Sequence, residues 1–361
     1  MIAALLIAGT LSWAAPFQHR LAADVEVVLP ARAHGLAYFP DEHITLLQRA
    51  PEIRLLLVAG TSTYLLSGSD MFSLSPVAQV LAPGEPGSFD NGYAGIFGAF
   101  QPPESQNVFA LYHAEDQEQM PTFENGVPGY FASVGMAVSR DGGLTFGKLG
   151  PVITGSLPKA ADGRPDQGVG EGSLLVDASG EYLYCYYSDH SRVDRRGVQI
   201  CLARCLARDV AKPDAWRKYF DGGFSEPGVG GRDSPLMSEP PVTGDGFIPH
   251  VVYVEEAHRY IMTFCRVYYA DLAPWQATES GIWVAVSGDG IHWDEPVQLL
   301  PGIPLPRPGE ELSWHPSFVI DSVSENRISG HLYYAYTESW GWAEPQKPHY
   351  LVRRALSVSV P

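Results

Sequence analysis

Short stretches in which apolar and polar residues alternate recur along the whole chain, and no long stretch keeps a helical period. Alternation with a period of two is typical of strands whose two faces differ in burial. Several such strands are followed by a short turn and an aromatic-rich strand, as in YAGIFGAF before VFALYHAE and PHVVYVEE before RYIMTFCRVYY. The pattern predicts an all-β protein built from antiparallel hairpins.

A second hairpin motif returns at a regular spacing. LLSGSDMFSLSPVAQVL, AVSRDGGLTFGKLGPVI and AVSGDGIHWDEPVQLL share a strand, a serine, a polar turn with aspartate, an aromatic residue, a proline and a second strand. Their serines, Ser67, Ser139 and Ser287, are 72 and 148 residues apart. An intermediate copy is therefore expected near residue 213, where CLARDVAKPDAWRKYF lies. A repeat of about 70 residues that contains about four strands suits a propeller blade.

Five such repeats in 361 residues predict one five-bladed β-propeller domain over residues 16–361, since no linker separates two regimes of composition. The expected blades cover residues 24–83, 84–156, 157–228, 229–303 and 304–361. The N-terminal ADVEVVLP and the C-terminal LVRRALSVSV could close the ring. The Ser-x-Asp turns then lie at the outer edges of blades, where serine, aspartate and glycine build turns. We expect a structural role for them.

The first residues, MIAALLIAGTLSWAAP, form an apolar run too short to span a bilayer, followed by small residues that suit a signal-peptidase cut. Residues 1–15 are interpreted as a signal peptide of a secreted or periplasmic protein, and a buried first strand is the alternative. The formal charge of −17 repels nucleic acid and anionic lipid surfaces, and no later segment suits a membrane helix. We expect neither as a partner, and a monomer or weak oligomer.

Four cysteines are present, at positions 185, 201, 205 and 265. Cys185 and Cys201 lie on strands that are expected to be hairpin neighbours. A cross-strand disulfide is one interpretation in an exported protein, and buried free thiols are the other.

Polar residues open the innermost strands of the expected blades. The first strand of a blade begins, and its antiparallel neighbour ends, on the same face of the protein. The residues at these strand starts are Asp41, Asp90, Glu171, His250 and His315, and those at the ends of second strands are His113, Glu115, Asp189, His190, Arg266, Glu338 and Trp340, with Trp314 beside His315. Strand interiors disfavour aspartate, and clustered like charges are costly, so this convergence indicates a site. Carboxylates beside aromatic rings suit a carbohydrate.

Hydrolysis of a glycosidic bond needs one carboxylic acid to protonate the leaving oxygen and one carboxylate to activate water or attack carbon. Asp41, Asp90 and Glu171 could supply the acid, the base and a third carboxylate that raises the pKa of the acid. The expected function is therefore a glycoside hydrolase that cleaves an extracellular glycan. The distance between acid and base, about 6.5–9.5 Å or about 5 Å, decides between inversion and retention, and our hypothesis is inversion.

The stretch EGSLLVDASGEYLYCYYSDHS resembles a blade of glycoside hydrolase family 43 and its five-bladed relatives, which begins Glu-Gly-Pro. The resemblance implies that Glu171 is the general acid. PDEHITLL is similar to the family's first-blade strand, which implies that Asp41 is the general base, and FDNGYAGIF implies that Asp90 modulates the acid. SWHPSFV implies that His315 lies at the pocket floor beside a structural calcium or a water; no other cofactor is expected. Asn91 and Ser173 replace prolines typical of the family.

Alternative functions remain open. SRDGGLTF is a full match to the Asp box of sialidases, which are usually six-bladed and need an arginine triad for a carboxylate; Arg192, Arg232 and Arg266 could bind one, but no Phe/Tyr-Arg-Ile-Pro motif appears early in the chain. A propeller can also bind carbohydrate without catalysis. Metal-dependent hydrolysis is a third alternative, since several histidines share one face, although none has the close spacing of a metal motif.

Overall fold

The computed structural model describes residues 17–123, 126–191, 197–237, 244–269, 277–302, 311–338 and 348–360. In these ranges the chain is nearly all β, with only three-residue 3-10 helices between some strands, so the all-β prediction is confirmed. These ranges contain no helix with the length and apolar character needed to span a membrane. The expected signal peptide, residues 1–15, lies outside the described residues.

The strands pair into successive antiparallel groups. Group A holds β3 (Thr45–Gln48), β4 (Ile53–Ala59), β5 (Ser62–Gly68) and β6 (Ser75–Leu81). Group B holds β7 (Tyr93–Phe100), β8 (Val108–Asp116), β9 (Tyr130–Ser139) and β10 (Gly147–Thr154). Group C holds β11 (Asp166–Val176), β12 (Tyr182–Asp189), β13 (Gln199–Leu206), β14 (Arg217–Phe220) and β15 (Gly223–Pro227). Short parallel pairings, β5 with β7 and β9 with β11, join these groups into one sheet.

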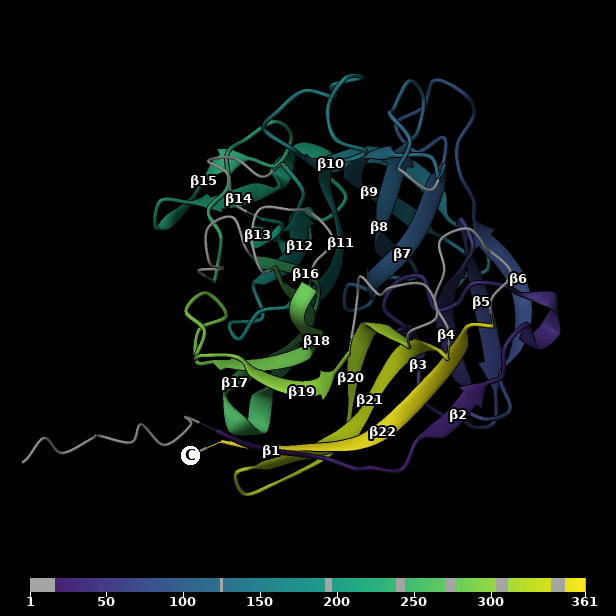
Figure 1. Cartoon of the computed structure of the whole chain (residues 1–361), viewed down its shortest axis with the longest axis vertical. Helices are drawn as coiled ribbons and strands as arrows, with labels where there is room; N and C mark the ends of the chain where they lie inside the picture. The colour runs from purple at the N-terminus through teal and green to yellow at the C-terminus, as the bar shows by residue number, and fades with distance from the viewer. Residues whose placement is uncertain are drawn as a thin grey trace, which may run out of the picture.

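Two further groups complete the described chain. Group D holds β16 (Gly244–Val254), β17 (Arg259–Tyr269), β18 (Ala277–Ser287) and β19 (Val297–Pro301). Group E holds β20 (Leu312–Ser324), β21 (Arg327–Thr337) and β22 (Tyr350–Ser359). Figure 1 shows the groups arranged around a common centre.

The two ends of the chain meet in group E. β1 (Gln18–Leu21) and β2 (Glu26–Leu29) both pair with β22, so the expected contact between ADVEVVLP and LVRRALSVSV is confirmed (Figure 1). β2 falls within the residues predicted for the first blade, but its pairing assigns it to the last sheet. The number of blades remains a prediction.

The core is a series of apolar layers, each between two neighbouring groups. Tyr112 lies in the layer between groups A and B, and Trp216 in the layer between B and C. On β12, Cys185 and Tyr187 face group B, whereas Tyr184 and Tyr186 face group D. Groups D and E share another layer, and E packs on A. Burial on both faces explains why YLYCYYS shows little alternation.

Bulges near the starts of three inner strands place a residue in the left-handed region. Glu171 has φ of 46°, Ile248 55° and His315 53°, and each lies at a break in strand register. Such bulges re-aim side chains and often occur beside active sites.

Two residues beyond each bulge, a side chain receives a hydrogen bond from the next group. Val251 N donates to Ser173 Oγ at 3.0 Å, Phe318 N to His250 Nδ1 at 3.2 Å, and Ile44 N to Ser317 Oγ at 3.1 Å. These bonds tie C to D, D to E and E to A around the centre. A proline at position 173, as the family has, could not accept the first bond.

The Ser-x-Asp turns are held together by their own side chains. Ser139 donates to Asp141 at 2.7 Å, and Asp141 accepts from the Thr145 amide and hydroxyl between β9 and β10. The turn at Ser287 has the same arrangement around Asp289. These bonds support the expected structural role.

The cysteines are free and buried in the structure. Cys185 pairs in register with Ala203, and Cys201 with Tyr187. The two thiols are therefore not on directly opposed residues, and the disulfide interpretation is not supported.

A fully buried lysine joins groups B and C. Lys218 Nζ donates to Thr154 O at 2.8 Å, Gly231 O at 2.8 Å and Asp233 Oδ2 at 2.9 Å. The side chain has no exposed area, so its three protons depend on these acceptors.

Replacement of Lys218 by methionine should destabilise the protein by about 3–5 kcal/mol, because Asp233, whose side chain is 9% exposed, loses the charge of Lys218 and keeps only the Tyr187 hydroxyl as a donor. Lys212→Met is the matched control, since Lys212 is 66% exposed in its pair with Asp209 and should change stability little. Urea unfolding followed by circular dichroism measures both. Equal stability of the two variants would show that the buried pair contributes nothing.

Candidate active site

Two acidic side chains from different groups are brought together at the centre of the molecule. Asp41 precedes β3 in group A, and Glu171 lies in β11 in group C. Their side chains are 18% and 17% exposed, so both remain accessible. His113 accepts a hydrogen bond from the Glu171 amide and His315 lies 3.6 Å from Asp41, and both carboxyl groups interact with both histidines, so they belong to one cluster.

The backbone of Glu171 is fixed from several sides. Its N–H donates to His113 Nδ1 at 2.9 Å, and its carbonyl accepts from Ser188 Oγ at 3.3 Å. A Cβ at Gly170 would lie 2.0 Å from the His113 ring, and one at Gly172 would lie 2.0 Å from the Tyr186 carbonyl oxygen. The Gly-Glu-Gly sequence is therefore required for this close packing, and it turns Glu171 at the bulge.

A buried histidine keeps Glu171 ionised. His190 Nε2 lies 3.4 Å from Glu171, and its Nδ1 lies 3.8 Å from Asp166. Burial alone would lower the pKa of His190, but the Asp166 and Glu171 carboxylates raise it to about 9. Burial opposes the ionisation of Glu171 too, yet the hydrogen bond and charge of His190 lower its pKa to about 2.

Asp41 has the opposite tendency. Burial raises the pKa of Asp41 to about 6, although His315 Nε2, 3.6 Å away, opposes the shift. The negative charge of Glu115 adds to the rise. Tyr93 donates its hydroxyl hydrogen to the backbone carbonyl of Asp41 and so helps to fix this segment. The cluster thus contains one carboxyl that is ionised and one that can hold a proton near pH 6.

His113 and Glu115 lie in the cluster, as the sequence predicts for ends of second strands. Because His113 Nδ1 accepts from the Glu171 amide, its Nε2 carries the proton and donates to Glu115 Oε1 at 3.2 Å. Gln117 donates to the other Glu115 oxygen at 2.8 Å. His113 is therefore a positioning residue that contacts the backbone of Glu171 and the side chain of Glu115.

Sequence reasoning missed Glu42 and His43, which follow Asp41 directly. Burial raises the pKa of Glu42 well above its usual range, and the charges of Glu171, Asp41 and Glu115 add to the effect. Burial lowers the pKa of His43 well below its usual range, with His250 and His315 adding to it. Hydrogen bonds to the Pro249 and Pro316 backbone oppose this shift of the His43 pKa, whereas Glu42 Oε2 has no hydrogen-bond partner among the described residues. Glu42 therefore tends to be a neutral acid behind the accessible pair.

Aromatic rings surround the cluster. Tyr93 and Tyr130 lie 5.2 and 6.0 Å from the His113 ring, and Tyr130 also lies 6.0 Å from His190. Tyr38 packs on His349 at 4.1 Å, and its own pKa is raised by burial and then by Asp41. The sequence did not predict these rings as site residues. Tyr93 does begin the inner strand β7, but the sequence analysis assigned Asp90, three residues earlier, to the site.

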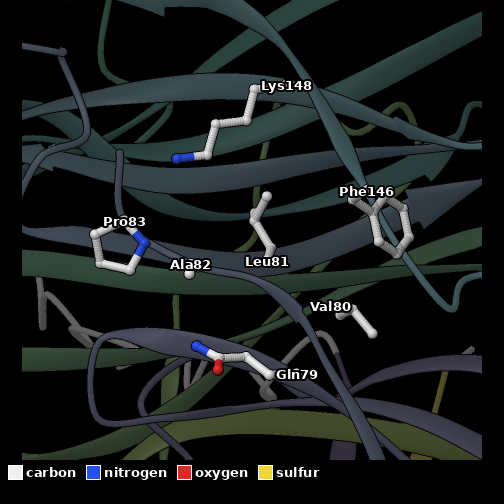
Figure 2. A pocket seen from close by; sticks show the side chains of 7 residues that line it. All are labelled: Gln79, Val80, Leu81, Ala82, Pro83, Phe146 and Lys148. Atoms are coloured by element: carbon white, nitrogen blue, oxygen red, sulfur yellow. The ribbon is translucent and has the colours of Figure 1, made fainter. Parts of the chain in front are cut away.

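Asp90 is not brought into the cluster. Its carboxylate forms an ion pair with Lys148 at 2.5 Å and accepts from the Tyr112 hydroxyl at 3.0 Å. Because Tyr112 and His113 are successive residues of β8, they point to opposite faces. Asp90 therefore lies on the face away from His113, where Lys148 and Phe146 line a separate pocket of about 500 Å³ (Figure 2).

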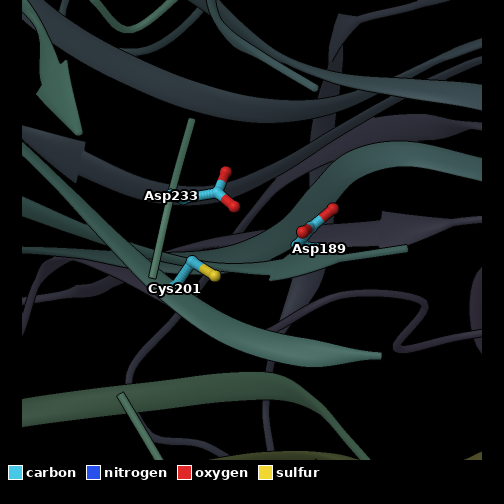
Figure 3. A group of neighbouring side chains, drawn as sticks. All are labelled: Asp189, Cys201 and Asp233. Carbon is cyan, nitrogen blue, oxygen red and sulfur yellow. The ribbon is translucent and has the colours of Figure 1, made fainter. Parts of the chain in front are cut away.

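Asp189 is also directed elsewhere. It lies with Cys201 and Asp233, whose ligand atoms are within 4.8 Å of one another (Figure 3). Burial, followed by the charge of Asp233, raises the pKa of Asp189 to about 6. Since Lys218 already donates to Asp233, this group is a buried ion-pair cluster between groups B and C.

The remaining predicted residues are more scattered. His250 packs 5.1 Å from His43, and burial lowers its pKa to about 4, so it is a neutral link between groups D and E. Arg266 stacks on Tyr268 and Trp283, and Trp314 packs 4.9 Å from His315. Glu338 is exposed just beyond β21, and Trp340 lies outside the described residues.

The residues near His315 do not fit a structural calcium. Calcium takes six to eight oxygen ligands. The side chains around His315 include the imidazoles of His43 and His349, and Asp41 supplies the nearest carboxylate. In the described part of the chain, the one group with three ligand atoms close together is that of Asp189, Cys201 and Asp233.

Comparison with known proteins identifies the fold. Neither a protein-family model nor a curated protein matches the sequence. Among solved structures, an α-L-arabinofuranosidase from Lactobacillus brevis is similar with 10% identity and a TM-score of 0.56, covering 88% of this chain and 91% of that one. An endo-arabinase from Bacteroides thetaiotaomicron has 14% identity and a TM-score of 0.52, covering 91% and 96%. A thermostable family-43 glycoside hydrolase has 13% identity and a TM-score of 0.50, covering 88% and 91%. The chain therefore has the fold of family-43 glycoside hydrolases and their relatives.

Removal of the His190 charge should raise the pKa of Glu171. In His190→Asn, the largest effect that opposes burial is lost and only the smaller effects of His113 and His315 remain, so we expect a Glu171 pKa above about 4 in place of about 2. Carboxyl ¹³C NMR titration of the full chain measures the change, with Glu171→Gln assigning the signal. Asp141, whose pKa is lowered to about 2 by Thr145 and Ser139, is an internal control that should not move. A Glu171 pKa that stays near 2 would contradict the role of His190.

Proposed function

We propose that the protein is a glycoside hydrolase, built as a five-bladed propeller from groups A to E, in which Asp41 and Glu171 are the catalytic carboxyl groups. The observation that carries the proposal is the presence, in one cluster, of two accessible carboxyl groups with opposite protonation tendencies. An acid and a base of this kind are what glycosidic hydrolysis requires. The shared fold with glycoside hydrolases supports the same function.

The electrostatics favour Asp41 as the proton donor and Glu171 as the base. His190 holds Glu171 in its ionised form, whereas Asp41 carries a proton below about pH 6. This is the reverse of the roles that the family resemblance implies. In the proposed reaction, the Asp41 proton passes to the leaving glycosidic oxygen as the bond to the anomeric carbon breaks. Glu171 takes a proton from the water that attacks this carbon, and the resemblance to family 43 supports attack with inversion.

The cluster favours a neutral sugar over a sialic acid. Arg232 forms an exposed ion pair with Glu226 at 2.7 Å, and Arg266 packs on aromatic rings. Arg192 lies outside the described residues. Tyrosine rings and carboxylates surround the cluster instead, and these stack on sugar faces and bind hydroxyl groups. We therefore place a neutral extracellular glycan before the sialidase-like and the purely carbohydrate-binding alternatives.

Leaving-group chemistry separates the acid from the base. Asp41→Asn and Glu171→Gln should each slow hydrolysis of 4-nitrophenyl or natural glycosides by about 10²–10⁴-fold, as expected for a lost general acid or base. With 2,4-dinitrophenyl glycosides, whose leaving group needs no proton, only Asp41→Asn should recover. A panel of arabinosides, xylosides, fucosides, galactosides and sialosides measures the rates.

The control for this experiment is Asp141→Asn, a carboxylate in a peripheral turn, which should hydrolyse all substrates as the wild type does. Recovery of Glu171→Gln instead of Asp41→Asn would reverse the two roles. Full activity of both variants would exclude the catalytic assignment, and unchanged binding without any hydrolysis by the wild type would favour a lectin.

The pH dependence of kcat/KM should have its descending limb near pH 6, because Asp41 loses its proton as the pH rises through its pKa. Glu171 remains ionised down to about pH 2, so no second limb is expected between pH 3 and 5. Initial rates with the best aryl glycoside measure the profile. A rising limb between pH 4 and 5 would contradict the low pKa of Glu171.

A further inference from the structure

A second pocket lies at the ends of β8 and β9, on the face of these strands opposite to the catalytic cluster. Its volume is about 530 Å³, within the range of ligand pockets. Its lining includes two aromatic rings and four polar side chains: Phe89, Phe131, Asp116, Ser133, Thr154 and Lys159.

Strand alternation places the pocket and the cluster on opposite faces of the same strand pair, with their residues adjacent in sequence. On β8, Glu115 belongs to the cluster and the next residue, Asp116, lines the pocket. On β9, Tyr130 packs on His113 and the next residue, Phe131, lines the pocket. Asp116 and Phe131 are opposed in register. Since successive side chains point to opposite faces, one strand pair separates the two sites.

The charges in the pocket cancel. Lys159 Nζ lies 2.7 Å from Asp116 Oδ2. The other Asp116 oxygen accepts from Asn91 Nδ2 at 2.7 Å and from the Glu118 amide at 3.0 Å, so the carboxylate is held in place. Asp116 and Lys159 are 23% and 26% exposed, which leaves both within reach of a ligand. A held, neutralised pair offers hydrogen bonds without selecting for a charged ligand.

The apolar part of the lining has the form that sugar rings use. Phe89 and Phe131 are both half-buried, so each keeps part of its ring open to the pocket. Aromatic rings stack on the C–H faces of sugars, while Ser133, Thr154 and the Asp116–Lys159 pair can bind hydroxyl groups. The net charge of −17 disfavours an anionic ligand.

We propose that this pocket binds a further sugar residue of the neutral oligosaccharide whose glycosidic bond lies at Asp41 and Glu171. The inference rests on the proposed function and adds a requirement for chain length. A substrate that crosses the ends of β8 and β9 gains contacts in the pocket, whereas a single sugar with an aryl leaving group reaches only the central cluster.

The test compares ligands of different length on full-length variants in the Glu171→Gln background, where turnover is prevented. The probes are 1,5-α-arabinohexaose, 1,4-β-xylohexaose and 1,4-β-galactohexaose, with the matching 4-nitrophenyl monosides, and isothermal titration calorimetry measures the affinities. In Phe131→Ala, a hexaose that binds should lose about five- to tenfold in affinity, since one aromatic contact is removed. The monoside should change less than about twofold, because it lies within the central cluster.

Phe72→Ala is the matched control, as Phe72 is 51% exposed on the β5–β6 turn and does not line the pocket. Lys159→Met is the second variant, and it retains Asp116 on Asn91; it should also weaken only the hexaose. Thermal melting checks that each variant is folded.

Equal loss for hexaose and monoside would mean that Phe131 only shapes the central cluster, and no loss for either would mean that the pocket binds no sugar. Each result overturns the inference, as does a wild-type pocket that gives hexaoses no advantage over monosides. Failure of the proposed function is recognised separately, by absence of hydrolysis in the aryl-glycoside panel while length-dependent binding persists.

Discussion

Every strand group in this protein is apolar on both faces, and the rest of the structure depends on covering both. A group can satisfy this requirement only between two others, so apolar layers form from A to E and the last layer packs E on A. The faces are then used for burial, and the edges of the inner strands are left to face the centre. The polar side chains of the candidate site lie there, at the starts of first strands and the ends of second strands.

The central edges are shaped by the same packing. The bulged residues Glu171 and His315 adopt positive φ, and hydrogen bonds to the next group hold the strand just beyond each bulge. The cost of the unusual backbone is met by these contacts and by the glycines beside Glu171. His113 and His190 then fix the position and the protonation of Glu171. A chain rich in acidic residues can keep several carboxyl groups together because some are neutral and others lie beside histidine.

Sequence pattern predicted the strands well where apolar runs are bounded by turns; β7 and β17 match YAGIFGAF and RYIMTFCRVYY residue for residue. It also placed Asp41, Glu171, His113, Glu115, His190 and His315 together, because starts of first strands and ends of second strands share a face. It could not show that Asp90 turns toward Lys148, since side-chain direction in the segment before β7 depends on the neighbouring group. Glu42 was missed because strict strand alternation would turn its side chain away from that of Asp41. In the structure, Asp41 and Glu42 lie in a bend before β3, so alternation does not apply to them. Asp166, Tyr130 and His349 come from positions that only the three-dimensional packing brings to the cluster.

The pairing of the chain ends has a mechanical consequence. Gln18 is opposed to Ser359, so the β1–β22 ladder begins at the first residue of β1 and the last residue of β22. A force that pulls these two strands apart acts first on the hydrogen bonds at Gln18 and Ser359, so the hydrogen bonds of the ladder break one after another and do not share the force. The pairing of β1 with β22 is thus expected to be weak against tension applied between these two strands.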